Sequence, residues 1–215
     1  MFPQRLLDGY RKFRGSRFVS ERRRYATLAE TGQQPRIMVV GCIDSRVSPE
    51  VIFDAAPGEI LVARNVANLV PAYELARDSQ HGTSAALEFA VQALAVEHIV
   101  VLGHALCGGI RAFADEAAPL SSGDFIGRWM AQIAPAAAGL GPRDDTFQTR
   151  LELASVVNSL GNLMTFPWIA ERVQAGRLSL HGAYFGVATG QLLVRDPATG
   201  QFAPVPGGQM RRRIS

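Results

Sequence analysis

The chain has 215 residues, of which 47% are hydrophobic, and a formal net charge of +3. This length corresponds to one domain, and the apolar content is enough for a sizeable core. The modest charge, and the lack of any stretch of roughly 18 to 20 apolar residues, argue against a nucleic-acid-binding or membrane-spanning protein. The short basic runs Arg22–Arg24 and Arg211–Arg213 are interpreted as a solvated face and a frayed tail.

The first 32 residues are predicted to form a helical arm, followed by a single zinc-binding α/β domain over residues 33–215. Between Pro3 and Glu30, apolar residues recur at helical spacing in two stripes, with a break near Gly15 and Ser16. The amino-terminal segment lacks the uninterrupted apolar core of a secretory signal, so a cytoplasmic location is expected. Two free thiols in a reducing compartment suit metal ligation better than a disulfide.

The rest of the chain alternates strand and helix patterns. Short, largely apolar runs predict strands at 36–41, 60–63, 98–102, 178–187 and 191–195. Helical patterns follow at 48–53, 82–94, 109–116, 124–133 and 144–174, the last broken near Gly161 and Pro167. This alternation predicts an α/β fold with a mainly parallel sheet of four to five strands, flanked by helices.

The only two cysteines follow the ends of two predicted strands. Cys42 comes directly after the strand at 36–41, and His104 and Cys107 follow the strand at 98–102. Ligand sites of open α/β sheets lie at the carboxyl ends of the strands. Thiolate and imidazole are typical zinc ligands. The sequence therefore predicts Zn²⁺ bound by Cys42, His104 and Cys107.

Asp44 and Arg46 continue the first motif at alternate positions, so their side chains face the same way in an extended chain. Asp44 has two possible partners. It either binds the metal as a fourth ligand and closes the site, or pairs with Arg46 in a two-pronged, charge-assisted contact that leaves the fourth position to water.

Four blocks of sequence resemble the β-class carbonic anhydrases: CIDSRV, PGEILVARNVANLVP, GTSAALEFAVQALAVEHIVVLGH and GHALCGG. The resemblance runs from about Gln33 to the strands near Val194. It implies a carbonate dehydratase, a lyase that reversibly hydrates carbon dioxide to bicarbonate and a proton. The bicarbonate-inhibited subclass has Trp where this chain has Val39, which favours the plant-type subclass. The resemblance also implies that the helical arm packs on a second subunit, in a homodimer or homotetramer.

The resemblance further implies roles for individual residues. Asp44, held by Arg46, would accept a hydrogen bond from the attacking hydroxide. Gln33 aligns with a glutamine that binds the substrate near the metal, in a site built at a subunit boundary. Three further positions align with the apolar wall of the substrate pocket: Leu61, Val66 and Phe89.

The expected mechanism follows from the metal, because bound zinc lowers the pKa of water to roughly 7 and makes hydroxide available near neutral pH. Zinc-bound hydroxide would then attack carbon dioxide. Three alternatives stay open from the sequence. They are a related zinc hydrolase of carbon disulfide or carbonyl sulfide, a non-catalytic zinc scaffold or bicarbonate-sensing module, and a thiol enzyme using Cys42 or Cys107 as nucleophile.

Overall fold

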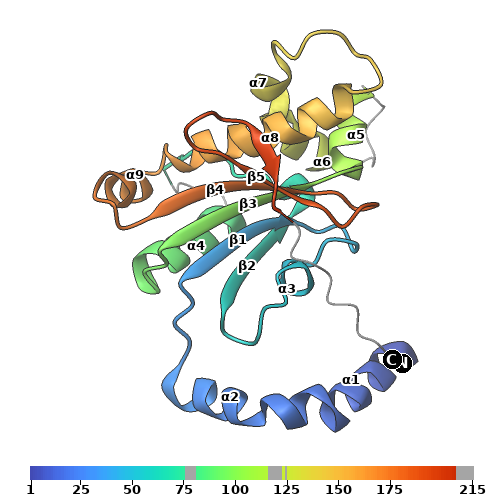
Figure 1. Ribbon diagram of the computed structural model, residues 1–215, viewed down its shortest axis with the longest axis vertical. Helices are drawn as coiled ribbons and strands as arrows, with labels where there is room; N and C mark the ends of the chain where they lie inside the picture. The colour runs from blue at the N-terminus through green and yellow to red at the C-terminus, as the bar shows by residue number, and fades with distance from the viewer. Residues whose placement is uncertain (76–80, 116–122, 124, 207–215) are drawn as a thin grey trace.

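The computed structural model describes residues 1–75, 81–115, 123 and 125–206. The basic run at 211–213 and the predicted helix ends at Glu116 and Asp124 lie outside these residues. The described chain contains a six-stranded sheet of order β2-β1-β3-β4-β5-β6 (Figure 1). Its strands are β1 (Ile37–Cys42), β2 (Ile60–Asn65), β3 (His98–His104), β4 (Ser179–Phe185), β5 (Leu192–Arg195) and β6 (Phe202–Pro204).

The first four strands are parallel, and β5 and β6 are added antiparallel at one edge. The predicted α/β class with a mainly parallel sheet is therefore confirmed. The predicted number of four to five strands is wrong, because β6 is a sixth strand. It has only three residues and ends in Pro204, so it carries no apolar run or alternation long enough to indicate a strand.

The interior strand β1 positions the first part of the site. Its residues from Met38 to Cys42 are all buried, as expected for a strand with neighbours on both sides and side chains packed on both faces. The parallel register aligns β1 with β2 and β3, so all three strands end at the same edge of the sheet.

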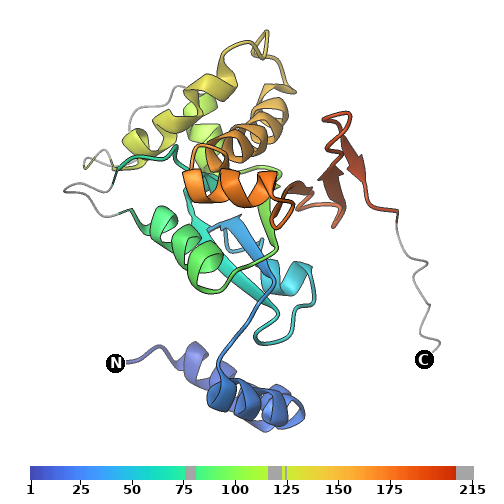
Figure 2. The same cartoon turned by 90° about the vertical axis from the view of Figure 1, so that its left-hand side faces the viewer.

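Helices cover the sheet unequally (Figures 1 and 2). The long helix α8 (Phe147–Leu163) packs on β3 and β4, and α4 (Gly82–Glu88) contacts β2 and continues into a π-helical segment, η2 (Phe89–Ala93). The other helices of this region are α3 (Pro49–Ile52), α5 (Gly108–Ala114), α6 (Phe125–Met130), α7 (Ala134–Ala137) and α9 (Pro167–Gln174).

The sequence predicts two breaks in the helical pattern over 144–174, near Gly161 and near Pro167. The first break comes slightly later than predicted. Helix α8 runs through Gly161 to Leu163, and α9 begins at Pro167. Phe166, directly before this proline, is extended with φ −76° and ψ 116°. A proline disfavours helical geometry in the residue before it, whereas a glycine within a helix lowers its stability without ending it.

The amino-terminal arm consists of α1 (Gln4–Gly15) and α2 (Arg17–Thr31), which meet at Ser16 as the sequence predicts. Contacts among the rings of Phe13, Phe18 and Tyr25 connect the two helices, with centroids 5.4 to 6.1 Å apart. Neither helix has a buried residue. Figures 1 and 2 show the arm set apart from the sheet and its helices.

Candidate metal centre

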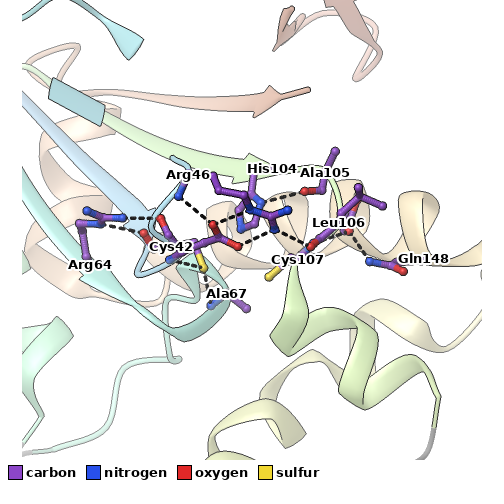
Figure 3. A network of polar contacts seen from close by, with 11 residues as sticks. Cys42, Arg46, Arg64, Ala67, His104, Ala105, Leu106, Cys107 and Gln148 are labelled. Carbon is purple, nitrogen blue, oxygen red and sulfur yellow. Dashed lines mark hydrogen bonds and ion pairs between the residues drawn. The ribbon is translucent and has the colours of Figure 1, made fainter. Parts of the chain in front are cut away.

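Three metal-binding side chains meet at the carboxyl edge of the sheet. Cys42 ends β1, His104 ends β3, and Cys107 directly precedes α5. Their ligating atoms all lie within 4.8 Å of one another, and all three residues are buried (Figure 3). The structure thus brings together the three residues that the sequence predicts as zinc ligands.

The orientation of His104 leaves one ring nitrogen available. Its Nδ1 lies 2.9 Å from the carbonyl oxygen of Ala105, and an N–H at this position donates to that oxygen. The other nitrogen, Nε2, is buried and has no hydrogen-bond partner in the described part of the chain. A buried polar atom without a partner is costly unless a ligand satisfies it. Two thiol sulfurs and this nitrogen form a donor set that fits Zn²⁺.

The two thiols differ in how readily each loses its proton. The Cys107 thiol, as a hydrogen-bond donor to Cys42, lowers the pKa of Cys42 below its ordinary value, against the opposing effect of burial. Backbone N–H groups of Asp44 and Ala67 also donate to Cys42 Sγ, at 3.5 and 3.3 Å. The pKa of Cys107 is raised by the same contact with Cys42 and by burial. One thiolate is therefore formed readily, and a cation would favour the second.

The segment η1 (Val66–Asn68) presents the Ala67 N–H to Cys42. Ala67 adopts a left-handed conformation, with φ 63°. The side chain of Asn65 clamps this segment, because its Oδ1 accepts from Leu69 N and its Nδ2 donates to Leu69 O, both at 2.8 Å. On the other side, Trp129 Nε1 donates to the carbonyl oxygen of Val66 at 2.7 Å.

Asp44 is paired with Arg46 and is not part of the three-residue donor cluster. Arg46 Nε lies 2.9 Å from Asp44 Oδ1, and Arg46 Nη2 lies 2.7 Å from Asp44 Oδ2. These hydrogen bonds hold the pKa of the Asp44 carboxyl well below its ordinary range, despite partial burial. Of the two arrangements open from the sequence, the structure shows the ion pair.

Arginines also order the backbone around the donors (Figure 3). Arg64 donates to the carbonyl oxygens of Cys42 and Asp44, at 2.8 and 2.7 Å. Arg46 Nη2 also donates to the carbonyl oxygen of Leu106 at 3.1 Å, in the turn between the second and third donors. Arg46 thus connects the two ligand-bearing turns, and Arg64 orders the backbone of the first turn.

The four predicted substrate-binding residues do not all lie beside the three donors of the same chain. Val66 packs in the apolar cluster that includes Cys42 and Cys107. Leu61 packs instead against the core beneath the helices. Phe89 lies in η2 and is 50% exposed.

Gln33 is exposed and precedes β1 by four residues. Cys42 is the last residue of β1, and a strand rises roughly 3.3 Å per residue. The length of the strand therefore separates Gln33 from the donors of its own chain.

Sequence reasoning missed Glu152 and Tyr184, which are buried and meet beside Cys107. Glu152 lies on α8 next to the buried Leu151 and three residues before the buried Ser155. A carboxylate on the apolar side of a helix was the available signal in the sequence. Recognising it requires knowing which face of α8 meets the sheet.

A mainly parallel sheet with a buried Cys-His-Cys donor set at its carboxyl edge defines an α/β protein with a candidate metal site. The family model of carbonic anhydrase matches residues 37–192. The chain belongs to the carbonic anhydrase family, and within it to the β class, as the relatives below show.

A chloroplastic β carbonic anhydrase 5 from Arabidopsis thaliana is 38% identical over 178 residues, which cover 80% of this chain and 58% of that relative. The chain thus spans less than two thirds of that relative's length. Among solved structures, the β-carbonic anhydrase CcaA is 30% identical with a TM-score of 0.82, and the match covers 96% of this chain and 92% of that one. A tetrameric β-carbonic anhydrase of Sordaria macrospora is 26% identical with a TM-score of 0.73, covering 92% and 96%.

Proposed function

We propose that the protein catalyses the reversible hydration of carbon dioxide to bicarbonate and a proton, with Zn²⁺ held by Cys42, His104 and Cys107. The observation that carries this proposal is the combination of a buried donor set with Asp44 turned onto Arg46. Three protein ligands leave a fourth position for water or substrate, as in catalytic zinc sites. Membership in the β-class family supports the same reaction.

Zinc in this site would acidify water, so that hydroxide is available near neutral pH. The Asp44 carboxylate stays ionised because Arg46 lowers its pKa, so it can accept a hydrogen bond from the attacking oxygen and orient it. Arg46 fixes both carboxylate oxygens and thereby prevents Asp44 from rotating toward the donors. Val66 would provide an apolar contact for carbon dioxide beside Cys42.

We assign Gln33, Leu61 and Phe89 to a substrate pocket completed by a second copy of the chain. Gln33 lies beyond the reach of its own donor set, and half of the Phe89 side chain is exposed in the single chain. A site at a subunit boundary reconciles these positions with a role near the metal. The plant-type arrangement, with Asp44 on Arg46 and Val39 in the first strand, is part of this proposal.

A homo-oligomer is supported by two surfaces of the chain and by the tetrameric Sordaria relative. The arm exposes Leu6, Tyr10 and Val19. The sheet face away from α8 borders a cavity of about 560 Å³ beside α2, with Ile60 and Val100 in its lining. We propose that a second copy covers both surfaces. Light scattering at several protein concentrations would distinguish a dimer from a tetramer.

The cytoplasmic location stays a prediction, since one relative is chloroplastic. No described helix is both long and apolar enough to cross a membrane.

The test is stopped-flow carbon dioxide hydration from about pH 6.5 to 9, on protein of measured zinc content. We expect turnover in proportion to zinc. Asp44→Asn should keep the metal and lose most of the activity, because the amide no longer offers two anionic acceptors to Arg46 and the attacking oxygen. Inactive wild-type protein with full zinc would refute the proposal. Activity toward carbonyl sulfide or carbon disulfide alone would identify the related hydrolase.

A further inference from the structure

Glu152 is a buried carboxylate beside the metal centre that the mechanism above does not use. It lies on α8 and is 3% exposed. Its Oε1 accepts a hydrogen bond from the backbone N–H of Cys107 at 3.0 Å. Burying a carboxylate is costly unless its oxygens are hydrogen-bonded. Hydrogen-bond donors must therefore satisfy both oxygens of Glu152, and the identity of these donors indicates what the residue does.

Both oxygens of Glu152 are held from two directions. Gln148 Nε2, one turn earlier on α8, donates to Oε1 at 2.9 Å, and Tyr184 Oη on β4 donates to Oε2 at 2.6 Å. Burial, together with the adjacent carboxylate, raises the pKa of Tyr184, so its hydroxyl keeps its proton and remains a donor. Figure 3 shows Gln148 on the side of the site where Leu106 and Cys107 lie.

The turn that Glu152 contacts is conformationally strained. Leu106 has φ 58°, a left-handed conformation that is unfavourable for a branched side chain and persists only when its surroundings hold it. Two contacts hold this turn: Arg46 Nη2 donates to the Leu106 carbonyl, and Glu152 accepts the next N–H, that of Cys107. The direction of the Cys107 side chain depends on this backbone.

We propose that Glu152 is a positioning residue of the metal centre. It fixes the backbone of Cys107 so that Sγ remains directed toward Cys42 and His104, and Tyr184 and Gln148 fix Glu152 in turn. Residues of α8 and β4, in the carboxyl-terminal half of the chain, thereby fix the orientation of Cys107 in the turn that follows β3. This inference deepens the proposed function and rests on its zinc site, but it concerns metal retention and not turnover.

The test compares Glu152→Met, which has similar length and no acceptor, with Glu152→Gln, which keeps a carbonyl acceptor for Cys107 N–H. Loss of a group that orients a metal ligand weakens metal binding by roughly 10–100-fold, so we expect this loss for the Met variant and near-wild-type affinity for the Gln variant. Zinc affinity is measured by competition with a chromophoric chelator. In Co²⁺-loaded protein, the thiolate-to-metal charge-transfer band should change in Glu152→Met and stay unchanged in Glu152→Gln.

A matched control separates positioning from general packing. Leu163→Ala opens a cavity at the far end of the same helix, where the side chain is fully buried. It should lower the urea midpoint without weakening zinc binding. The proposal is overturned if Glu152→Met binds zinc like the wild type, or if Leu163→Ala weakens zinc as much.

A second variant decides the question should Glu152→Met not fold. Tyr184→Phe removes only the hydroxyl that holds Oε2, and it should weaken zinc binding and alter the Co²⁺ band in the same sense. Unchanged affinity and spectrum in this variant would overturn the proposal. A wild-type protein that binds no zinc would remove both this inference and the proposed function. Tight zinc binding by the wild type and all variants would remove the inference alone.

Discussion

Replacing Asn65 with Ala should destabilise the protein and weaken its metal centre together. The Asn65 amide makes two hydrogen bonds of 2.8 Å to the backbone of Leu69, and a third, at 3.2 Å, to the hydroxyl of Thr83. These bonds close the segment that presents the Ala67 N–H to Cys42 Sγ. The substitution removes all three hydrogen bonds.

The magnitude follows from the burial of Leu69, which is 1% exposed. A hydrogen bond contributes about 1 kcal/mol net, and a buried backbone group left without a partner costs about 1–3 kcal/mol. Water that enters beside the shortened side chain would offset part of this cost. We therefore expect a loss of about 2–4 kcal/mol in the free energy of unfolding.

Urea unfolding at fixed protein concentration measures this loss, and chelator competition measures zinc affinity. Asn162→Ala is the matched control, because its amide makes a single 2.8 Å bond to the carbonyl of Val70, in the same loop but without a link to Cys42. The control should lose about 1–3 kcal/mol, less than Asn65→Ala because it removes one bond and not three, and it should keep its zinc affinity. An Asn65→Ala variant that loses less than the control, or that binds zinc with wild-type affinity, would refute the reasoning.

Three further predictions test separate features. Cys107→Ala should lose most of its zinc, because only two donors remain, and full occupancy by metal analysis would exclude the proposed ligand set. Gly103→Ala should cost about 1–3 kcal/mol in urea unfolding, since the new Cβ would lie 2.6 Å from Val156 Cγ2, and an unchanged midpoint would contradict this packing. Burial and the charge of His98 lower the pKa of His181 in the folded protein. The unfolded chain, whose histidine has the ordinary pKa of about 6.5, therefore binds a proton at higher pH than the folded protein does. Stability should fall as the pH drops from about 6.5 through the folded-state pKa. His98→Ala should raise the pKa of His181 in an NMR titration. An unchanged pKa would show that the charge of His98 does not affect His181.

The clustering of Cys42, His104 and Cys107 and the four parallel strands could be predicted because both depend on short-range patterns. A buried parallel strand is a short apolar run, and the edge where such strands end collects the residues that follow them. Cys42 and His104 end their strands, so their meeting follows from the topology. The choice between the two partners of Asp44 did not follow from spacing, because either geometry satisfies the alternation of a strand.

The pocket residues show a different limit. Gln33 and Phe89 were assigned from the family resemblance, and in a single chain neither has a contact that indicates a substrate role. In the proposed function, their roles depend on a second copy that covers the arm and the partly uncovered face of the sheet. A pattern within one sequence predicts that these surfaces need cover, but it does not specify which residues of the other copy meet the donors.

The orientation of the three donor side chains depends on contacts between residues that are distant in the sequence, whereas their identity can be read from short motifs. Cys42 Sγ receives an N–H from Ala67, and Cys107 is held by Glu152, which is 45 residues away in the sequence. Ala67 and Leu106 both adopt left-handed conformations that their side chains disfavour, and no glycine at either position signals the turn. Such strain persists only because distant side chains stabilise it. Residue types thus specify which atoms can bind the metal, whereas long-range contacts to strained backbone specify where those atoms point.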